Sequence, residues 1–158
     1  MPIAQYSDLL NASIYITGGG SGIGAALTEG FLAQNARVAF IGRSDASDFC
    51  SEMERKYGNR PLFIQGDITD TTTLKASMEE TANAHGPITT LINNAADDQR
   101  HSTREVTPEV WDWMIEVNLK AYFFACQTVL PQMQKAGFGS IINFSSISYM
   151  MGNAGYPI

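Results

Sequence analysis

The feature that most constrains this chain is a glycine-rich turn between a short apolar run and a helix-like segment. Five glycines fall between Gly18 and Gly24. Residues 13–16 before them form a run typical of a buried strand, and Ile23 and Leu27 after them begin a helical face. In a strand-to-helix turn, glycine allows positive φ, close approach of a ligand to the backbone, and close packing of helix on strand. The turn therefore predicts a phosphate-binding unit, with a plain loop as the alternative.

The start of the following helix supports the phosphate interpretation. Its first N–H groups have no partner within the helix, and the helix dipole is positive there. Gly18, Gly22 and Gly24 are spaced G-x-x-x-G-x-G, which differs from the G-x-G-x-x-G of the general dinucleotide fingerprint. The turn predicts a pyrophosphate ligand, and residues further along the chain are needed to decide which molecule carries it.

Length and composition favour one ordinary globular domain, residues 1–158. The chain has 44% hydrophobic and 16% charged residues, and no apolar run approaches the roughly 20 residues that cross a bilayer. A net charge of −6 without a basic stripe argues against nucleic acid as a partner. The amino terminus lacks the features of a secretory signal, so a cytoplasmic location is expected. Cys50 and Cys126 lie far apart, which predicts packing roles and no metal site.

Five apolar strand-like runs alternate with helical patterns, without an internal repeat. This alternation predicts an α/β fold, a Rossmann-like, doubly wound parallel sheet with strand order 3-2-1-4-5. In such sheets ligands bind beyond the carboxyl ends of the strands, near the switch point between strands 1 and 4, so the residues after each strand are candidates for a site. Strands are expected at 13–16, 37–41, 61–65, 89–93 and 140–144, and helices at 23–33, 48–57, 71–85 and 108–136.

Several helix ends carry boundary signals. Ser47 is predicted to cap the helix that Gly58 ends, and Thr107 to cap the helix that opens at Pro108. Gly137 ends that last helix. The residues after the fifth strand are predicted to form a loop.

The residues at the strand ends resemble those of the short-chain dehydrogenase/reductase family, and the resemblance covers the whole chain. Five motifs occur in the family's order and at similar intervals, which is far more specific than one glycine turn. The resemblance also implies a fold truncated before its strands 6 and 7. The matching residues are Thr17 with Gly18, Gly22 and Gly24, then Asp67, Asn93-Asn94-Ala95, Asn118 and Ser146.

The resemblance implies a nicotinamide dinucleotide held along the strand ends. The glycines would hold its pyrophosphate, Asp67 would bond its adenine, and Asn94 would border it. Asp67 also has a simpler interpretation as a turn residue or helix cap. The family usually has glycine where Ala96 stands, and the methyl group here narrows any close approach to the backbone. The implied cofactor residues are Thr17, Gly18, Ser21, Gly22, Ile23, Gly24, Arg43, Asp67, Ile68, Asn94, Ala95 and Ala96.

The end of the second strand bears on the choice between NAD and NADP. NAD-preferring members of the family place an acidic residue there, which accepts from the ribose 2′-hydroxyl. This chain has Gly42 followed by Arg43, and an arginine attracts a 2′-phosphate. The resemblance therefore favours NADP over NAD. The alternatives are that Arg43 is an ordinary surface residue or that Asp45 turns inward.

The resemblance also implies hydride transfer between the cofactor and an alcohol or carbonyl carbon. The family uses an Asn-Ser-Tyr-Lys set, in which Asn118 matches the asparagine of a proton relay and Ser146 the serine that bonds the reacting oxygen. Asn118 has the alternative of a helix polar residue that bonds backbone. The Tyr-x-x-x-Lys motif is absent, since Tyr156 has no lysine four residues later, and Tyr156 is assigned to the substrate loop. Without the base that this chemistry needs, the chain as printed is expected not to turn over.

Loop residues give the only indication of a substrate. Arg100, His101, Ser148 and Tyr149 resemble the aldose (D-xylose) 1-dehydrogenase branch of the family, and donors and acceptors in a loop suit a polyhydroxylated sugar. An ordinary solvated loop is the alternative. Other branches of the family, which act on 3-oxoacyl thioesters or other secondary alcohols, offer alternative substrates.

Two hypotheses of different classes follow from the sequence. One is an NAD(P)-dependent oxidoreductase acting on a small molecule, and the other is a non-catalytic fragment that binds a dinucleotide or dimerises. Family members commonly pair the helix between Leu119 and Met133 across a subunit interface, so the resemblance implies a homo-oligomer. Neither hypothesis involves a membrane.

Overall fold

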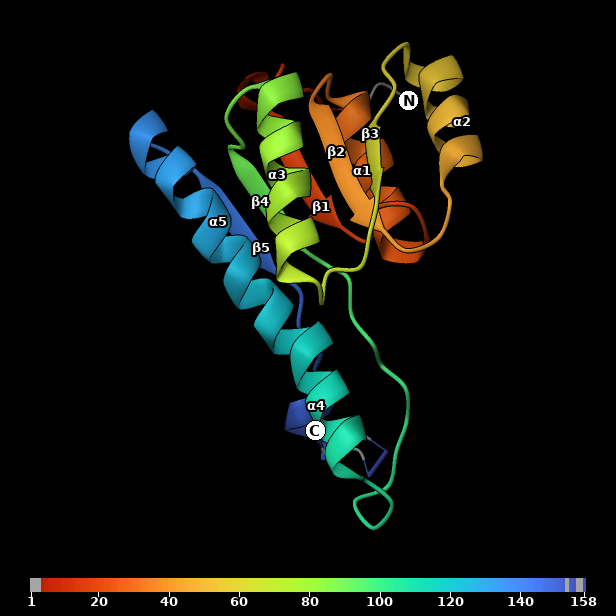
Figure 1. Ribbon diagram of the computed structural model, residues 1–158. Helices are drawn as coiled ribbons and strands as arrows, with labels where there is room; N and C mark the ends of the chain where they lie inside the picture. The colour runs from red at the N-terminus through yellow and green to blue at the C-terminus, as the bar shows by residue number, and fades with distance from the viewer. Residues whose placement is uncertain (1–3, 153, 156–157) are drawn as a thin grey trace.

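The computed structural model describes residues 4–152, 154–155 and 158 of the chain. Its strands form one parallel sheet in the order β3-β2-β1-β4-β5 (Figure 1), which confirms the predicted fold class and strand order. Thr17 lies opposite Ile41 on one side and Asn93 on the other, so the carboxyl ends of the central strands meet at one edge. The strands are β1 (Ser13–Thr17), β2 (Arg37–Gly42), β3 (Leu62–Gln65), β4 (Thr90–Asn93) and β5 (Ser140–Asn143).

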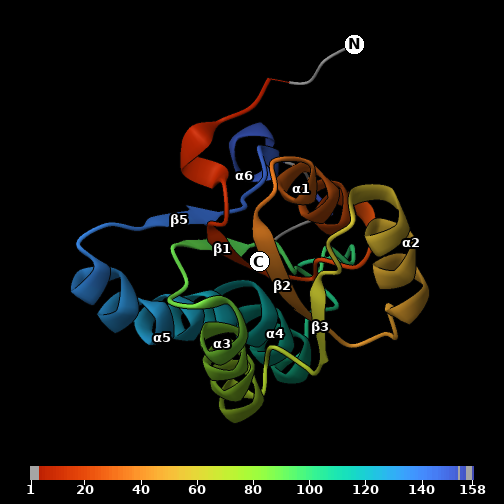
Figure 2. The ribbon, with the colours of Figure 1, turned by 90° about the horizontal axis from the view of Figure 1, so that it is seen from above.

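Helices cover both faces of the sheet. Figure 2 shows α1 and α2 on one face and α3, α4 and α5 on the other. In the part of the chain that the structure describes, no helix is long and apolar enough to cross a membrane. The helices are η1 (Ser7–Leu9), α1 (Gly22–Ala33), α2 (Ser47–Tyr57), α3 (Thr71–His85), α4 (Pro108–Ile115), η2 (Glu116–Lys120), α5 (Ala121–Ala136) and α6 (Ser148–Met151).

The sheet separates two apolar cores. Ile14 and Ile16 of β1 pack in the core under α1 and α2, whereas Tyr15 between them packs in the core under α3 and α5. β1 is therefore apolar on both faces, as its sequence suggested. The Tyr15 hydroxyl hydrogen-bonds to Ser77 of α3, and burial raises the pKa of this tyrosine well above its usual range. A buried hydroxyl without a partner costs about 1–3 kcal/mol, so this contact helps to fix α3 on the sheet.

Helix α2 begins differently from the prediction. Ser47 is its first residue, and the Asp45 carboxylate accepts hydrogen bonds from the Ser47 N–H and hydroxyl at 3.0 and 2.6 Å. The prediction of Ser47 as the cap is therefore wrong, because a carboxylate two residues earlier is the stronger acceptor. Gly58 ends the helix with a φ of 69°, as predicted.

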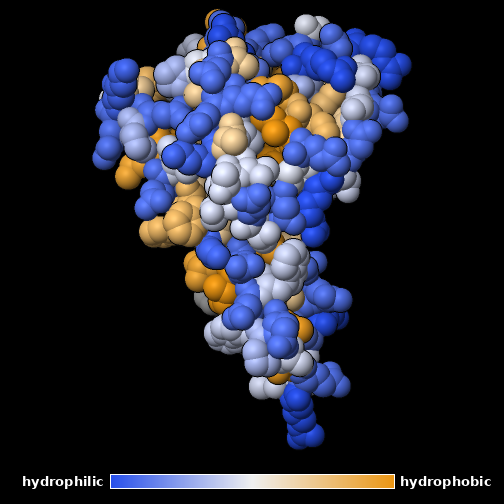
Figure 3. Space-filling view, in the orientation of Figure 1, coloured by the Kyte–Doolittle hydropathy of each residue, from blue (hydrophilic) through white to orange (hydrophobic). Residues whose placement is uncertain are grey.

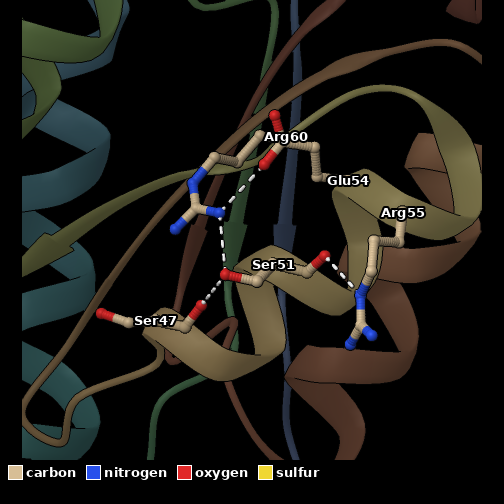
Figure 4. Close-up of polar contacts among 5 residues, drawn as sticks. All are labelled: Ser47, Ser51, Glu54, Arg55 and Arg60. Atoms are coloured by element: carbon tan, nitrogen blue, oxygen red, sulfur yellow. Dashed lines mark hydrogen bonds and ion pairs between the residues drawn. The ribbon is translucent and has the colours of Figure 1, made fainter.

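A polar network ties the chain after α2 to the outer face of this helix (Figure 4). Arg60 folds back so that its guanidinium donates to Ser51 Oγ at 3.0 Å and to the Glu54 carboxylate at 3.1 Å. Arg55 donates to the Ser51 carbonyl at 3.3 Å. Because these charged groups are exposed, the network directs the chain toward β3 but adds little stability.

Helices α4 and α5 join through η2 into one helical segment. Thr107 accepts from the Val110 N–H at 3.4 Å, and Pro108 is the first helical residue, so the predicted start is confirmed. The segment ends at Gly137, whose φ is 77°. Its irregular part is the π-helical turn η2, a feature that often lies at functional sites. The loop predicted after β5 is wrong at residues 148–151, where α6 forms.

Candidate active site

The carboxyl ends of the strands open into a cavity of about 1360 Å³. It lies beside the switch point of the sheet, where α1 leaves β1 toward one face and the segment after β4 leads to the other. The fold thus gathers residues from distant parts of the chain. The predicted site residues that line the cavity are Gly18, Ser21, Gly22, Ile23, Gly24, Arg43, Asp67, Ile68, Asn94, Ala95, Ala96, Asn118, Ser146 and Ser148.

The glycine turn between β1 and α1 forms one wall of the cavity. Gly18 and Gly22 have φ values of 72° and 53°, which other residues rarely adopt. A Cβ at Gly24 would lie 1.9 Å from the Gly18 carbonyl oxygen, so the turn has no room for a side chain there. No side chain caps α1 at Ser21, which leaves the first N–H groups of the helix for another acceptor. This arrangement suits a phosphate group.

Thr17 and Asn94 lock the ends of β1 and β4 together beside the cavity. The Thr17 hydroxyl accepts from the N–H groups of Asn94 and Ala95, each at 3.0 Å. The Asn94 amide donates to the carbonyls of Thr17 and Gly18 at 3.0 and 3.2 Å. Thr17 is buried and is not among the residues that line the cavity, so its position suits support of the turn and not the direct contact expected from sequence.

Asp67 and Asp70 after β3 have separate structural roles. Asp67 Oδ1 accepts from the Thr69 N–H and hydroxyl at 2.9 and 2.8 Å, which is the turn role that the sequence allowed. Asp70 is the cap of α3, since its Oδ1 accepts from the N–H groups of Thr72 and Thr73 at 2.9 and 3.2 Å. Asp67 is therefore a turn residue and not the cap, and the turn engages only one of its carboxylate oxygens.

Arg43 and Asp45, the two charged residues after β2, make different contacts. The guanidinium of Arg43 lies over the ring of Trp113, with its carbon 5.9 Å from the ring centroid. Asp45 also borders the cavity, but its carboxylate accepts the Ser47 hydrogen bonds, which hold its pKa below its usual range. The guanidinium of Arg43, and not the carboxylate of Asp45, thus extends from the end of β2 toward the opposite wall of the cavity.

Asn118 lies in the π-helical turn and clamps the segment after β4. Its Oδ1 accepts from the Asp97 N–H at 2.9 Å, and its Nδ2 donates to the Asp97 carbonyl at 2.9 Å. Both ends of the amide are therefore engaged with backbone, which is the structural alternative that the sequence left open for this residue. The clamp therefore fixes the part of the cavity wall that Asp97 and Asn118 form.

Ser146 and Ser148 form a pair of hydroxyls after β5. Their Oγ atoms lie 2.8 Å apart, and Ser146 Oγ accepts from the Ser148 N–H at 3.2 Å. Ser146 is exposed to the cavity. Either hydroxyl of the pair can donate to the other, so the Ser146 proton can reach an oxygen of a ligand when Ser148 is the donor.

Arg100 and His101 are not among the described residues that line the cavity. The side chain of Arg100 runs beside Gly155, and the His101 N–H donates to the Gly155 carbonyl at 3.1 Å. His101 Nδ1 lies 2.9 Å from the Gln99 carbonyl. The direct contacts predicted for Arg100 and His101 are not supported by these positions, because local bonds hold their loop against residue 155. The side chain of Tyr149 and all of Tyr156 lie outside the described residues.

Sequence reasoning misses Asp97 and Trp113, which also line the cavity. Asp97 Oδ2 accepts from Trp113 Nε1 at 2.8 Å, and Asp97 Oδ1 accepts from the Gln99 N–H at 2.9 Å. These bonds hold the pKa of Asp97 below its usual range, and the nearby Arg43 charge adds a smaller effect. The available signal is helical spacing, since Trp113 precedes Val117 by one turn on the face toward the cavity.

The cavity suits a large ligand whose anionic part lies at the glycine turn, since the carboxylates of Asp45, Asp67, Asp97 and Asp98 also line it. Its volume exceeds the range of about 300–1,000 Å³ that is usual for small-ligand pockets, which suits a molecule with two nucleotide halves. Arg43 is the one cation among the described residues that line it. Within the described residues, no group of three His, Cys, Asp or Glu side chains could hold a metal ion. The donors therefore suit a dinucleotide with its phosphates at the glycine turn.

Residues 12–158 match the family model described as short chain dehydrogenase, and the chain belongs to this family. The protein named "Probable galactose dehydrogenase GalD" of Rhizobium meliloti is 42% identical over 99% of this chain and 62% of its own length. A D-xylose 1-dehydrogenase of Caulobacter vibrioides is 40% identical over 96% of this chain and 60% of its own length. The chain thus spans about 60% of the length of these curated relatives.

A solved structure shares the fold. It is the L-sorbose reductase from Gluconobacter frateurii complexed with NADPH and L-sorbose, with a TM-score of 0.87 and 25% sequence identity. The match covers 94% of this chain and 57% of that one. The family resemblance and its sugar dehydrogenase branch, both inferred from the motifs at the strand ends, are thereby confirmed.

Proposed function

We propose that this chain is the dinucleotide-binding domain, residues 1–158, of an NAD(P)-dependent oxidoreductase that acts on a small alcohol or carbonyl compound. The observation that carries the proposal is that one cavity is bordered by the glycine turn, by Asn118 and by Ser146. When bound, the cofactor supplies the carbon that gives or accepts a hydride. The remaining roles belong to the chain's own residues, which bind and orient the cofactor and donate hydrogen bonds.

Binding begins at the glycine turn. The uncapped first turn of α1 attracts the pyrophosphate, and the tight contact at Gly24 keeps side chains out of its path. Asp67 and Ile68 contact the adenine end of the ligand, and Asn94 with the two alanines after it borders the other half. Thr17 keeps the turn and the end of β4 at a fixed separation.

Ser146 and Asn118 serve the reacting end. The Ser146 hydroxyl donates to the reacting oxygen of the substrate, and such a donor stabilises the alkoxide that develops during hydride transfer. Its orientation is set by Ser148, which occupies the acceptor side of the oxygen. Asn118 acts through its clamp on Asp97, which holds the opposite wall in place.

A sugar is the proposed substrate. Two relatives are named for galactose and D-xylose, and the solved relative holds L-sorbose. The paired hydroxyls of Ser146 and Ser148 offer a donor and an acceptor to a polyol. A 3-oxoacyl thioester or another secondary alcohol is the alternative.

NADP is the proposed cofactor, with NAD as the alternative. Arg43 extends toward the opposite wall of the cavity, whereas the carboxylate of Asp45 is engaged by Ser47. The solved relative contains NADPH. We also propose a cytoplasmic location, which fits the free thiols of Cys50 and Cys126 on opposite faces of the sheet.

Calorimetric titration of the purified chain with NADPH and with NADH tests the binding part. We expect NADPH to bind at least about tenfold more tightly than NADH, since a charge-assisted contact with Arg43 is available only to the phosphorylated ribose. Failure to bind either dinucleotide would refute the proposed function. Tighter binding of NADH would refute only the choice of cofactor.

Assays of NADP⁺ reduction with D-galactose, with D-xylose, and with D-sorbitol, the alcohol that corresponds to L-sorbose, test the catalytic part. The chain as printed should not turn over, because none of its tyrosines is followed by lysine four residues later. Turnover by this chain would contradict the assigned catalytic set. A gene product that continues into a Tyr-x-x-x-Lys segment, binds NADPH and oxidises no alcohol would instead favour the non-catalytic alternative.

A further inference from the structure

Arg43, Asp97 and Trp113 form a line of contacts across the cavity. Arg43 follows β2, Trp113 belongs to α4, and Asp97 lies in the segment after β4. All three line the cavity. The contacts therefore join the end of β2 to the helix that packs on the other side of the opening.

The ring of Trp113 is held firmly by Asp97. The indole N–H donates to Asp97 Oδ2 at 2.8 Å, and the other carboxylate oxygen accepts from the Gln99 N–H at 2.9 Å. Asn118 clamps the Asp97 backbone through two hydrogen bonds of 2.9 Å. The Asp97 that holds the indole thus makes three further hydrogen bonds, one through its carboxylate and two through its backbone, so the ring has little freedom to turn.

Arg43 lies on this fixed ring. Its guanidinium carbon is 5.9 Å from the ring centroid, within the distance at which a cation is attracted to an aromatic face. Arg43 is exposed, and an exposed arginine loses rotamer entropy when it orders around a ligand. A contact that already restricts the side chain reduces this loss at the moment of binding.

We propose that Trp113 is a positioning residue that holds the Arg43 guanidinium at the cavity for the 2′-phosphate of NADP(H). The inference rests on the proposed function and adds to it a determinant of cofactor selectivity outside the end of β2. Selectivity then depends on an aromatic residue of α4, and on the carboxylate of Asp97 that fixes its ring, as well as on the arginine itself.

The ratio of NADPH to NADH affinity, measured by calorimetry, tests the role. W113A should weaken NADPH binding by about fivefold, the order of a cation–π contact, and change NADH binding by less than about twofold. W113F keeps an aromatic face and should retain most of the ratio. R43A should lose the preference outright, and W113A added to R43A should change the ratio no further, because the group that Trp113 positions is gone.

Trp111 offers a matched control on the same helix. It is 51% exposed and is not among the described residues that line the cavity. W111A should leave the ratio unchanged. Thermal unfolding of each variant identifies a loss of folding, which would weaken the binding of both dinucleotides alike.

The outcomes separate this inference from the proposed function. An equal loss of NADPH and NADH affinity in W113A overturns the positioning role, and so does a further change of the ratio in the R43A background. If the unaltered chain prefers NADPH and W113A keeps that preference, the inference fails while the proposed function stands. If the unaltered chain binds neither dinucleotide, both fail.

Discussion

Two glycines of one helix show how much depends on single residues. A Cβ at Gly24 would lie 1.9 Å from the Gly18 carbonyl oxygen and 2.8 Å from the Asn94 amide nitrogen. At Gly30, two turns further along α1, the same atom would meet nothing within 4 Å. Both residues are glycine in the same helix, yet only the first is required by its surroundings.

Alanine at each of these positions should have opposite effects. Gly24→Ala should lower the free energy of unfolding by about 1–3 kcal/mol through overpacking, and should weaken NADPH binding because the turn must shift. Gly30→Ala should raise the free energy of unfolding by about 0.5–1 kcal/mol, since alanine is the better helix former. Urea denaturation and NADPH titration measure the two effects. A Gly24→Ala variant with unchanged stability and binding would mean that the turn relaxes freely.

Among the elements, α3 has the most explicit start signal. Asp70 accepts from the N–H groups of Thr72 and Thr73 and from the Thr73 hydroxyl at 2.7 Å. The hydroxyl of Thr73 is the main cause of a pKa for Asp70 below its usual range, followed by the two N–H groups. The carboxylate therefore stabilises the helix more in its ionised form than in its protonated form.

Asp70→Ala should lower the melting temperature at neutral pH because α3 loses its cap. The folded pKa of Asp70 lies below the unfolded value of about 3.9, so its contribution is present above that pH and is lost as the pH falls through the folded pKa. Calorimetric scans should show the difference between the original chain and Asp70→Ala shrinking with acidification. Asp70→Asn, which keeps a neutral acceptor but no charge, should lie between Asp70→Ala and the original chain at neutral pH. A difference that does not change with pH would contradict the role of the charge.

The segment from α4 to α5 illustrates what periodicity can and cannot predict. Its apolar spacing and its Thr107 and Gly137 signals predict one helix with these ends, and the structure confirms both. The π-helical turn at Glu116–Lys120 has no such signal. A single π-helical turn within a longer helix differs from its flanks in backbone hydrogen bonding, and the apolar spacing does not report that difference.

At the scale of the whole molecule, apolar side chains stay exposed along one side. Orange and pale orange atoms gather at the left edge in Figure 3, where α5 runs in Figure 1. Leu119, Phe123 and Leu130 are 60%, 61% and 47% exposed. Ile141 and Ile142 of β5 are 38% and 42% exposed, and as successive residues of a strand they face opposite sides of the sheet. Exposed apolar side chains gathered along one helix are typical of an interface.

The isolated chain should therefore associate through the helix between Leu119 and Met133. The double variant L119E/F123E should shift the chain toward the monomer in light scattering after size exclusion, because charges on this face resist burial. A26E places the same kind of charge on an exposed position of α1, across the sheet from α5, and should leave the oligomer unchanged. A monomeric original chain at high concentration would contradict the prediction.

Local patterns in the sequence are sufficient to predict the strands of the sheet. Each strand is predicted to within one residue at either end, because apolar runs and glycine boundaries are signals between neighbours in the chain. Right-handed crossovers then lead to the observed strand order. Since parallel strands end at the same edge, the residues that follow them, such as Asp67, Asn94 and Ser146, are also predictable as the lining of one cavity.

By itself, then, the sequence determines the order of the strands, the edge at which the cavity opens, and the glycines that border it. Only the tertiary structure decides that Asp45 accepts from Ser47 at the start of α2, that the loop of His101 bonds to residue 155, and that Trp113 meets Arg43 across the cavity. The physical reason is that these outcomes depend on side chains that compete for partners in space. The hydrophobic period of a helix or strand and the spacing of a motif contain no information about that competition.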